Sequence, residues 1–252
     1  MTNQKLTDVS STGWLPKAAF GICTAVLLAG SVTPPVFAEE AANGDLPTVQ
    51  IFKKVKDTYA SMITYSDEGC VVTARGTTIN FSTRLARTNF YLIEWQQANP
   101  TAGSGSQAVW NSGAGDFLQS EAGVQPQGDR KIALAHAGAF SGGVTRTVPQ
   151  VFFNLQWEDE PVDDLEFSVT RQADEAVENI SCYVFARGAM GTTNTLWIGK
   201  QDFLIHQARM VVSMESMPAF TATETHTNIV LNRKFSRSDF VPSFPLFQSS
   251  ED

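Results

Sequence analysis

The side chains best suited to catalysis or metal binding are widely spaced along this 252-residue sequence. Its three histidines, His136, His206 and His226, lack the H-x-x-x-H spacing that presents two imidazoles to one metal ion. No serine stands in a G-x-S-x-G turn, and neither Cys70 nor Cys182 has a neighbour that marks a catalytic thiol. We therefore expect no metal site and no enzyme active site. Two histidines beside one acid in a single cleft would instead indicate a hydrolase.

Two other segments resemble ligand-binding motifs. Residues 158–166 hold six carboxylates, but they lack the alternating acids and central glycine of a calcium loop, so we expect a solvated loop, with a weak cation site as the alternative. The pattern Gly103-x-Gly105-x-x-Ala108 resembles a dinucleotide fingerprint. It follows Asn-Pro-Thr and leads into Val109-Trp110 rather than into a helix, so a hairpin tip is expected. These segments predict no cofactor.

The first 38 residues have the pattern of a bacterial signal peptide. Lys5 and Lys17 precede a nearly uncharged apolar run over residues 18–32, and Val36-Phe37-Ala38 offers small residues for cleavage near Ala38. The apolar run is shorter than a membrane-spanning helix requires. We expect export to the periplasm and a single domain over residues 39–252, with an uncleaved anchor as the alternative.

The charge of the chain limits its partners. The net charge is −8, and no basic tract is present, so nucleic acid is an unsuitable partner because its binding depends on neutralising phosphates. An anionic membrane surface is disfavoured for the same reason, and we expect transient membrane contact at most. In an oxidising compartment Cys70 and Cys182 are candidates for a disulfide, with two separate buried thiols as the alternative.

Hydrophobic periodicity predicts an α+β fold. Val49, Phe52, Val55, Tyr59 and Met62 recur every three or four residues, which indicates an amphipathic helix over about residues 47–63. From residue 66 the period becomes two, which is typical of strands, and one hairpin is expected around residues 199–202. Short helices are expected in residues 129–156. This order favours an antiparallel sheet with a small helical insert.

The expected strands carry much apolar surface. The strand over residues 90–95 is apolar on both faces, while the expected helices are too few to cover a large sheet twice. An ordinary sheet–helix core would explain these residues. A curved sheet wrapped around its helices would instead leave an apolar hollow for a ligand.

In order and local pattern, residues 46–245 resemble the LolA/LolB-like lipoprotein carriers of Gram-negative bacteria. The segments that carry the resemblance are YASMITYSDEG, INFSTRLARTNFYLIEW, AVWNSGAGDF, TLWIGKQDFLIHQ and NRKFSRSDFVPSFP. The resemblance implies a curved, unclosed antiparallel β-barrel with lid helices, here the first helix and residues 129–156. Acyl chains would lie between sheet and lid. Arg87 would hydrogen-bond lid carbonyls and keep the empty cavity shut, with Arg84 as the alternative.

We therefore expect a periplasmic, non-enzymatic carrier or binding protein for a lipid or an acylated lipoprotein. The alternative is an envelope-stress sensor or regulatory domain that binds a protein partner. Sheet-side lining of the cavity is expected from Phe90, Leu92, Trp95, Trp110, Trp197 and Phe203. Lid-side lining is expected from Val148, Val151, Phe152 and Leu155.

Overall fold

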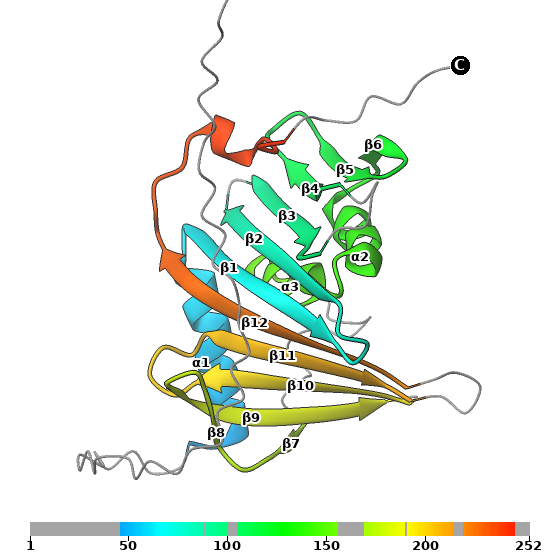
Figure 1. Ribbon diagram of the computed structural model, residues 1–252. Helices are drawn as coiled ribbons and strands as arrows, with labels where there is room; N and C mark the ends of the chain where they lie inside the picture. Colours follow the sequence, from blue (N-terminus) through cyan, green and yellow to red (C-terminus); the bar gives the residue numbers. More distant parts are fainter. Residues whose placement is uncertain are drawn as a thin grey trace, which may run out of the picture. The chain divides into compact units, whose positions relative to one another are not determined.

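In the computed structural model, the strands form one antiparallel sheet that does not close into a barrel (Figure 1). The structure describes residues 46–87, 89–99, 105–155, 169–189, 191–213 and 219–244. Within these ranges the sheet has twelve strands. The first six are β1 (Thr64–Thr73), β2 (Thr78–Ala86), β3 (Tyr91–Gln97), β4 (Gln107–Asn111), β5 (Asp116–Ser120) and β6 (Gly123–Gln127). The others are β7 (Thr170–Arg171), β8 (Glu175–Val177), β9 (Ile180–Ala189), β10 (Thr192–Gly199), β11 (Ile205–Val212) and β12 (Phe220–Leu231).

Strands that are neighbours in the sequence pair in the sheet from β1 to β6 and from β8 to β12, and the two halves join where β1 pairs with β12. The order is β6-β5-β4-β3-β2-β1-β12-β11-β10-β9-β7, and β8 pairs with β9. The last long strand, β12, therefore returns beside the first, with Cys70 opposite Thr225. Within each half of the sheet, these consecutive strands lie side by side because a tight turn suffices to reverse the chain between antiparallel neighbours. The expected α+β fold with an unclosed antiparallel sheet is confirmed.

Within the described ranges, three α-helices cover one face of this sheet, behind the strands in Figure 1. They are α1 (Thr48–Ser61), α2 (Arg130–Phe140) and α3 (Val148–Phe152), and the short 3₁₀ helix η1 (Val144–Arg146) joins the last two. The apolar face of α1 is buried as its periodicity predicts, although Val49 is 45% exposed and Ile51 is buried in its place. Asp129 caps α2 by accepting a hydrogen bond from the Ile132 amide, which determines where this helix begins.

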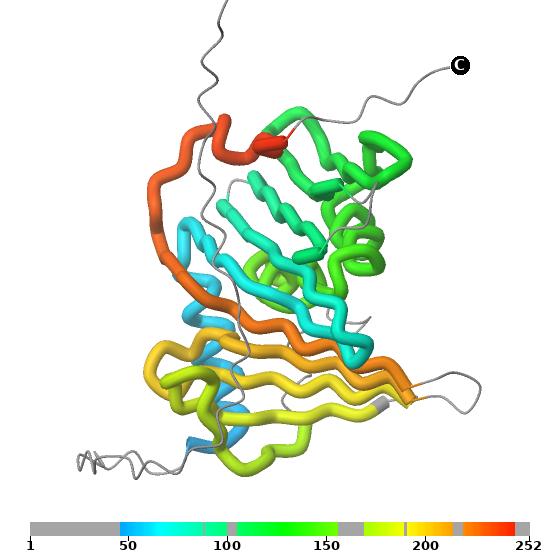
Figure 2. Tube along the Cα trace, in the orientation of Figure 1, coloured from blue at the N-terminus to red at the C-terminus, as the bar shows by residue number. Residues whose placement is uncertain are grey.

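The opposite face of β2–β5 is covered by the end of the chain. After β12 the chain crosses to strands β2–β4 and forms the 3₁₀ helix η3 (Arg237–Phe240), a course that is clear in the Cα trace (Figure 2). Phe240 packs there against a cluster with Ala86, Leu92, Ala108 and Trp110. We call residues 232–244 the C-terminal strap. The sheet is thus buried on both faces in this half.

The hairpin expected around residues 199–202 forms, but its second strand differs from the prediction. The turn extends to Leu204, and Phe203 has a positive φ of 56°. One continuous strand, β11, then runs from Ile205 to Val212. No helix within the described ranges is long and apolar enough to cross a membrane. The predicted signal peptide and the carboxylates of residues 158–166 lie outside the described residues.

Candidate functional site

The space between the sheet and the helices is filled by side chains. Phe152 from α3, Leu134 from α2 and Tyr59 from α1 are all completely buried there. They pack against sheet residues such as Phe81 and Ile93 in one continuous apolar cluster. Of the ten residues expected to line a cavity, six belong to this cluster or pack against it: Trp95, Val148, Val151, Phe152, Leu155 and Phe203.

The other four expected lining residues do not face the helices. Phe90, Leu92 and Trp110 lie with Phe240 under the C-terminal strap. Trp197 lies in a separate cluster with Val177 and Cys182, where its indole N–H donates to Glu175 at 2.8 Å. A ligand held between sheet and helices would not touch these four side chains. The physical reason is strand alternation: Leu92 is paired with Trp110, so both point the same way, while their neighbours Ile93 and Val109 point to the helices.

Arg87, directly after β2, connects the sheet to two helices. Its Nε donates to the Met62 carbonyl at 3.2 Å, and its Nη2 donates to the Tyr59 carbonyl. These carbonyls lie at the C-terminal end of α1, where helix carbonyls lack partners within the helix and carry partial negative charge. The guanidinium also stacks over the ring of Phe152 in α3, at 4.4 Å from the ring centroid. We call this set of contacts the Arg87 latch.

A second arginine extends this arrangement and was not predicted from the sequence. Arg130, the first residue of α2, stacks over Phe153 at 4.0 Å and donates to Asn89 at 3.1 Å. Phe152 and Phe153 contact each other edge to face at 5.0 Å. Burial, together with the positive charge of Arg130, lowers the pKa of Arg87. Each aromatic ring at the end of α3 is thus covered by one guanidinium.

Arg84, the alternative to Arg87, lies elsewhere. Its Nη1 donates to the Asp239 carbonyl at 3.0 Å, and its Nη2 is 3.8 Å from Glu94. Both contacts are on the side of the C-terminal strap. Between the two candidates, Arg87 is therefore the one placed to hold the helices.

A buried charged cluster lies between the sheet and the segment before α3. His226 of β12 is held between two carboxylates, with Nδ1 at 2.6 Å from Asp67 and Nε2 at 3.0 Å from Glu224. Tyr65 donates to Asp67 at 2.8 Å, and Thr147 donates to Glu224 at 2.5 Å. Burial alone would lower the pKa of His226, but the negative charges of Glu224 and Asp67 raise it to about 10. The imidazole is therefore cationic at neutral pH.

Gly69 makes room for this cluster. It is paired with His226 across the β1–β12 ladder, and a Cβ atom at this position would lie 2.4 Å from the ring of Phe81 and 2.1 Å from the Thr225 carbonyl oxygen. Phe81 uses that space to meet the imidazole edge to face, at 5.5 Å between centroids. The sequence pattern did not reveal this cluster, because its members lie on strands that are far apart in the chain.

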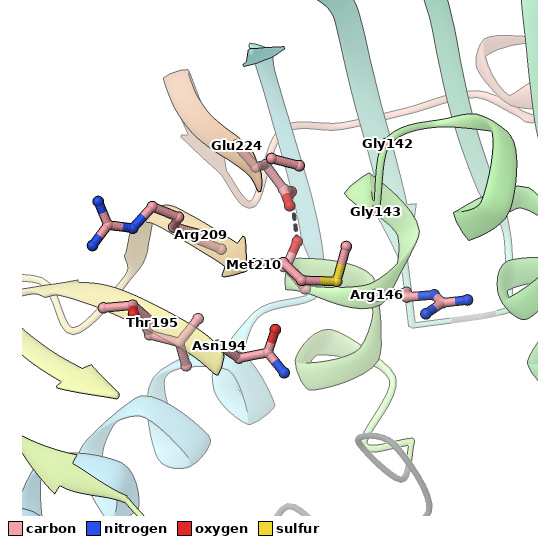
Figure 3. Close-up of a pocket in the computed structure, with 12 residues that line it drawn as sticks. Gly142, Gly143, Arg146, Asn194, Thr195, Arg209, Met210 and Glu224 are labelled. Carbon is pink, nitrogen blue, oxygen red and sulfur yellow. Dashed lines mark hydrogen bonds between the residues drawn. The ribbon is translucent and has the colours of Figure 1, made fainter. Parts of the chain in front are cut away.

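A small cavity adjoins the charged cluster where the turn after α2 approaches β10–β12 (Figure 3). Its volume is about 40 Å³, which is enough for a few water molecules and far below the roughly 300 Å³ of small-molecule pockets. The guanidinium groups of Arg146 and Arg209 point away from it in Figure 3. Its lining includes Gly142, Gly143, Thr147, Asn194, Leu196, Ala208, Met210, Ala222 and Glu224.

The other two histidines do not join this cluster. His206 is buried beside Asp202, at 2.9 Å, and stacks over Gly199 on the sheet face opposite to the helices. His136 is exposed on α2 and contacts Gln127 at 2.8 Å. Two histidines beside one acid therefore do not occur in a single cleft, and no group of potential metal ligands forms among the described residues.

Cys70 and Cys182 do not form the candidate disulfide. They lie on β1 and β9, which three other strands separate. At about 4.8 Å per strand their Cα atoms are roughly 19 Å apart, whereas a disulfide requires less than about 7 Å. Both are buried, as in the second alternative of the sequence analysis.

We expect the Cys182 thiol to be unreactive in the folded protein. Burial raises its pKa to about 11, so iodoacetamide at neutral pH should label it about 100-fold more slowly than in urea. Mass spectrometry of the Cys182 peptide, without reductant, measures both rates. Equal labelling in the two states would contradict the buried thiol, and absence of labelling in urea would indicate a disulfide.

A scan against protein-family models and a search of curated proteins gave no match. Several solved structures resemble the chain at low identity. A DUF1329 family protein from Desulfovibrio piger is 15% identical, with a TM-score of 0.35 over 79% of this chain and 99% of that one. A LolA superfamily protein from Nitrosomonas europaea is 10% identical, with a TM-score of 0.33 and the same coverages. The Pseudomonas aeruginosa MucA/MucB complex contains a chain that is 9% identical, with a TM-score of 0.44 over 79% of this chain and 62% of that one.

These similarities concern the fold. One of these structures is of a LolA superfamily protein, the group that the sequence resembles.

Proposed function

We propose that this protein is an exported, non-enzymatic carrier that holds the acyl chains of a lipid or lipoprotein between its sheet and its helices. The observation that carries the proposal is the Arg87 latch. One side chain from the sheet holds the end of α1 through two carbonyls and covers Phe152 of α3. These contacts are reversible, and behind them lies a cluster of apolar residues.

The free energy needed to break the Arg87 latch can be compared with the free energy gained by burying one acyl chain. Breaking two hydrogen bonds from a charged group costs about 3–6 kcal/mol, and losing the cation–π contact costs about 1–2 kcal/mol more. Burying an acyl chain contributes about 0.8 kcal/mol for each methylene, so one chain of about 16 carbons gives on the order of 12 kcal/mol. A single acyl chain is therefore sufficient to offset release of the latch. The closed state, with its cavity of about 40 Å³, would be the empty state.

Arg87→Gln tests the proposal. It keeps a polar side chain but loses the charge and the fork of donors, so the open population should rise. We expect uptake of a fluorescent fatty acid to become about tenfold faster or more. Arg84→Gln is the matched control, because Arg84 bonds the C-terminal strap, and uptake should keep the wild-type rate. Native mass spectrometry with lipid extraction should show a lipid adduct.

A protein-binding regulatory domain is the second candidate. It is favoured by the side chains that fill the space between the sheet and the helices in the described residues, since the cavity beside Thr147, at about 40 Å³, holds no acyl chain. If neither the wild type nor Arg87→Gln takes up fatty acid, and no lipid is extracted from the purified protein, the carrier proposal is wrong. The regulatory reading then replaces it.

A further inference from the structure

Three exposed apolar side chains surround one end of the β1–β12 pair. Ile63, between α1 and β1, is 70% exposed, and Val230 and Leu231 at the end of β12 are 45% and 40% exposed. Leu231 and Val230 are paired with Tyr65 and Ser66 at the start of β1, so their side chains lie on the two faces of the sheet at this end of the strands. The Ile63 amide donates to Asn232 at 2.8 Å, which places it beside the other two. Single exposed apolar residues are ordinary, but an adjacent set indicates a binding surface.

Basic side chains follow this apolar set directly. Arg233, Lys234 and Arg237 are exposed, and Thr64 donates to the Arg233 carbonyl at 2.7 Å, which holds that residue against β1. Asp239 is the only acid in residues 229–244, and its carboxylate accepts from the Ser236 amide at 2.6 Å. In a chain with a net charge of −8, this is a local concentration of positive charge. We call Ile63, Val230, Leu231, Arg233 and Lys234 the basic rim.

The basic rim is continuous with the Arg87 latch. The Arg87 amide donates to the Ile63 carbonyl at 3.0 Å, and its guanidinium bonds the carbonyl of Met62, the preceding residue. The start of β1, the end of β12 and the first part of the C-terminal strap lie on the same side of the sheet in Figures 1 and 2. A surface that engages Ile63 therefore lies next to the contacts that hold α1.

We propose that the basic rim binds the surface of an anionic phospholipid bilayer. The end of the β1–β12 pair meets the bilayer, so that Ile63, Val230 and Leu231, on both faces of this end, enter the headgroup region, and Arg233 and Lys234 pair with lipid phosphates. The net negative charge of the chain disfavours binding to an anionic bilayer. Electrostatic attraction to a membrane falls off within a Debye length, however, so the charges nearest to the bilayer determine whether the protein binds. The basic rim is separate from the proposed acyl-binding interior, so the membrane proposal and the carrier proposal can fail independently.

Two other partners fit the basic rim less well. A second copy in a twofold contact would place the same arginine and lysine against each other. Three apolar side chains are far fewer than the 20–30 residues that each side of a typical protein interface contributes. A bilayer requires neither a matching shape nor a large contact.

Binding of the full-length gene product, purified as the cell processes it, to lipid vesicles tests the proposal. Vesicles of equal parts phosphatidylglycerol and phosphatidylcholine should bind the protein, and pure phosphatidylcholine should not. Ile63→Asp should weaken binding about tenfold or more, because it removes the most exposed apolar group. Lys234→Glu should weaken it roughly fivefold or more, and added salt should weaken the wild type.

Two matched variants serve as controls. Val72→Asp changes an apolar residue that is 44% exposed near the other end of β1, roughly 30 Å away along the strand. Lys131→Glu reverses an exposed charge on α2. Both should bind vesicles like the wild type, and all four variants should show the wild-type circular dichroism spectrum.

Three results would contradict the proposal that the basic rim binds an anionic bilayer. They are absence of binding to anionic vesicles, equal binding to both vesicle types, and equal losses in the control variants. If the protein is instead a dimer that Ile63→Asp dissociates, the surface is an interface between copies and the membrane proposal is wrong. Uptake of free fatty acid without vesicle binding would leave the carrier proposal standing. Vesicle binding without fatty-acid uptake would support the membrane proposal and contradict the carrier proposal.

Discussion

Replacing His226 by alanine is expected to lower the free energy of unfolding by about 3–5 kcal/mol. The imidazolium is the cation between Asp67 and Glu224, and all three side chains are buried. Without it, two carboxylates remain close together in the core, and among the described residues their donors are the Tyr65 and Thr147 hydroxyls. A loss of this size is a large part of the roughly 5–15 kcal/mol that stabilises a typical domain.

Urea unfolding, followed by circular dichroism, measures this change. His136→Ala is the matched control, because His136 is exposed and should cost less than about 0.5 kcal/mol. Combining His226→Ala with Asp67→Asn and Glu224→Gln removes both carboxylate charges, so it should recover part of the loss. A His226→Ala protein as stable as the wild type would show that the cluster is not charged in the folded state.

The stability of the wild type is expected to fall as the pH rises from about 6.5 towards 10. The pKa of His226 is about 10 in the folded protein and about 6.5 in the unfolded chain, so its contribution is fully present below pH 6.5. Between these values the folded state keeps a proton that the unfolded state has lost. Each pH unit in this range therefore lowers the free energy of unfolding by about 1.4 kcal/mol from this residue alone.

Unfolding measurements between pH 7 and pH 8 test this dependence, since cysteine, lysine and tyrosine titrate mainly above that range. His226→Ala should largely lose the slope, while His136→Ala should keep it. A wild type whose stability rises or stays constant over this range would contradict a raised pKa at His226.

The charged cluster also has a mechanical consequence for the proposed carrier. Thr147 stands between η1 and α3, and its bond to Glu224 holds this turn on β12. Arg87 holds the far end of α3 through Phe152. The short helix is therefore attached at both ends, so moving it away from the sheet requires both contacts to break.

Much of the fold could be predicted from local sequence. The spacing of Phe52, Val55 and Tyr59 predicts α1, and the short period-two segments predict an antiparallel sheet, because both signals depend on neighbours in the chain. The face on which a strand residue lies could not be predicted where both faces are apolar. In β3, Leu92 and Ile93 are equally hydrophobic, yet Leu92 packs under the C-terminal strap and Ile93 packs under the helices.

The sequence by itself determined the helix and strand pattern and the acidic balance, and the resemblance to the LolA/LolB-like carriers implied Arg87, or else Arg84, as a residue that holds the helices. Only the tertiary structure decided which side chains meet. It placed Cys70 and Cys182 on strands with three others between them and brought Asp67 and His226, 159 positions apart in the chain, to 2.6 Å. It also gathered Ile63 with Leu231 and Arg233 into one surface. The reason is that β12 returns to pair with β1, and such a long-range pairing leaves no periodic signal in either segment.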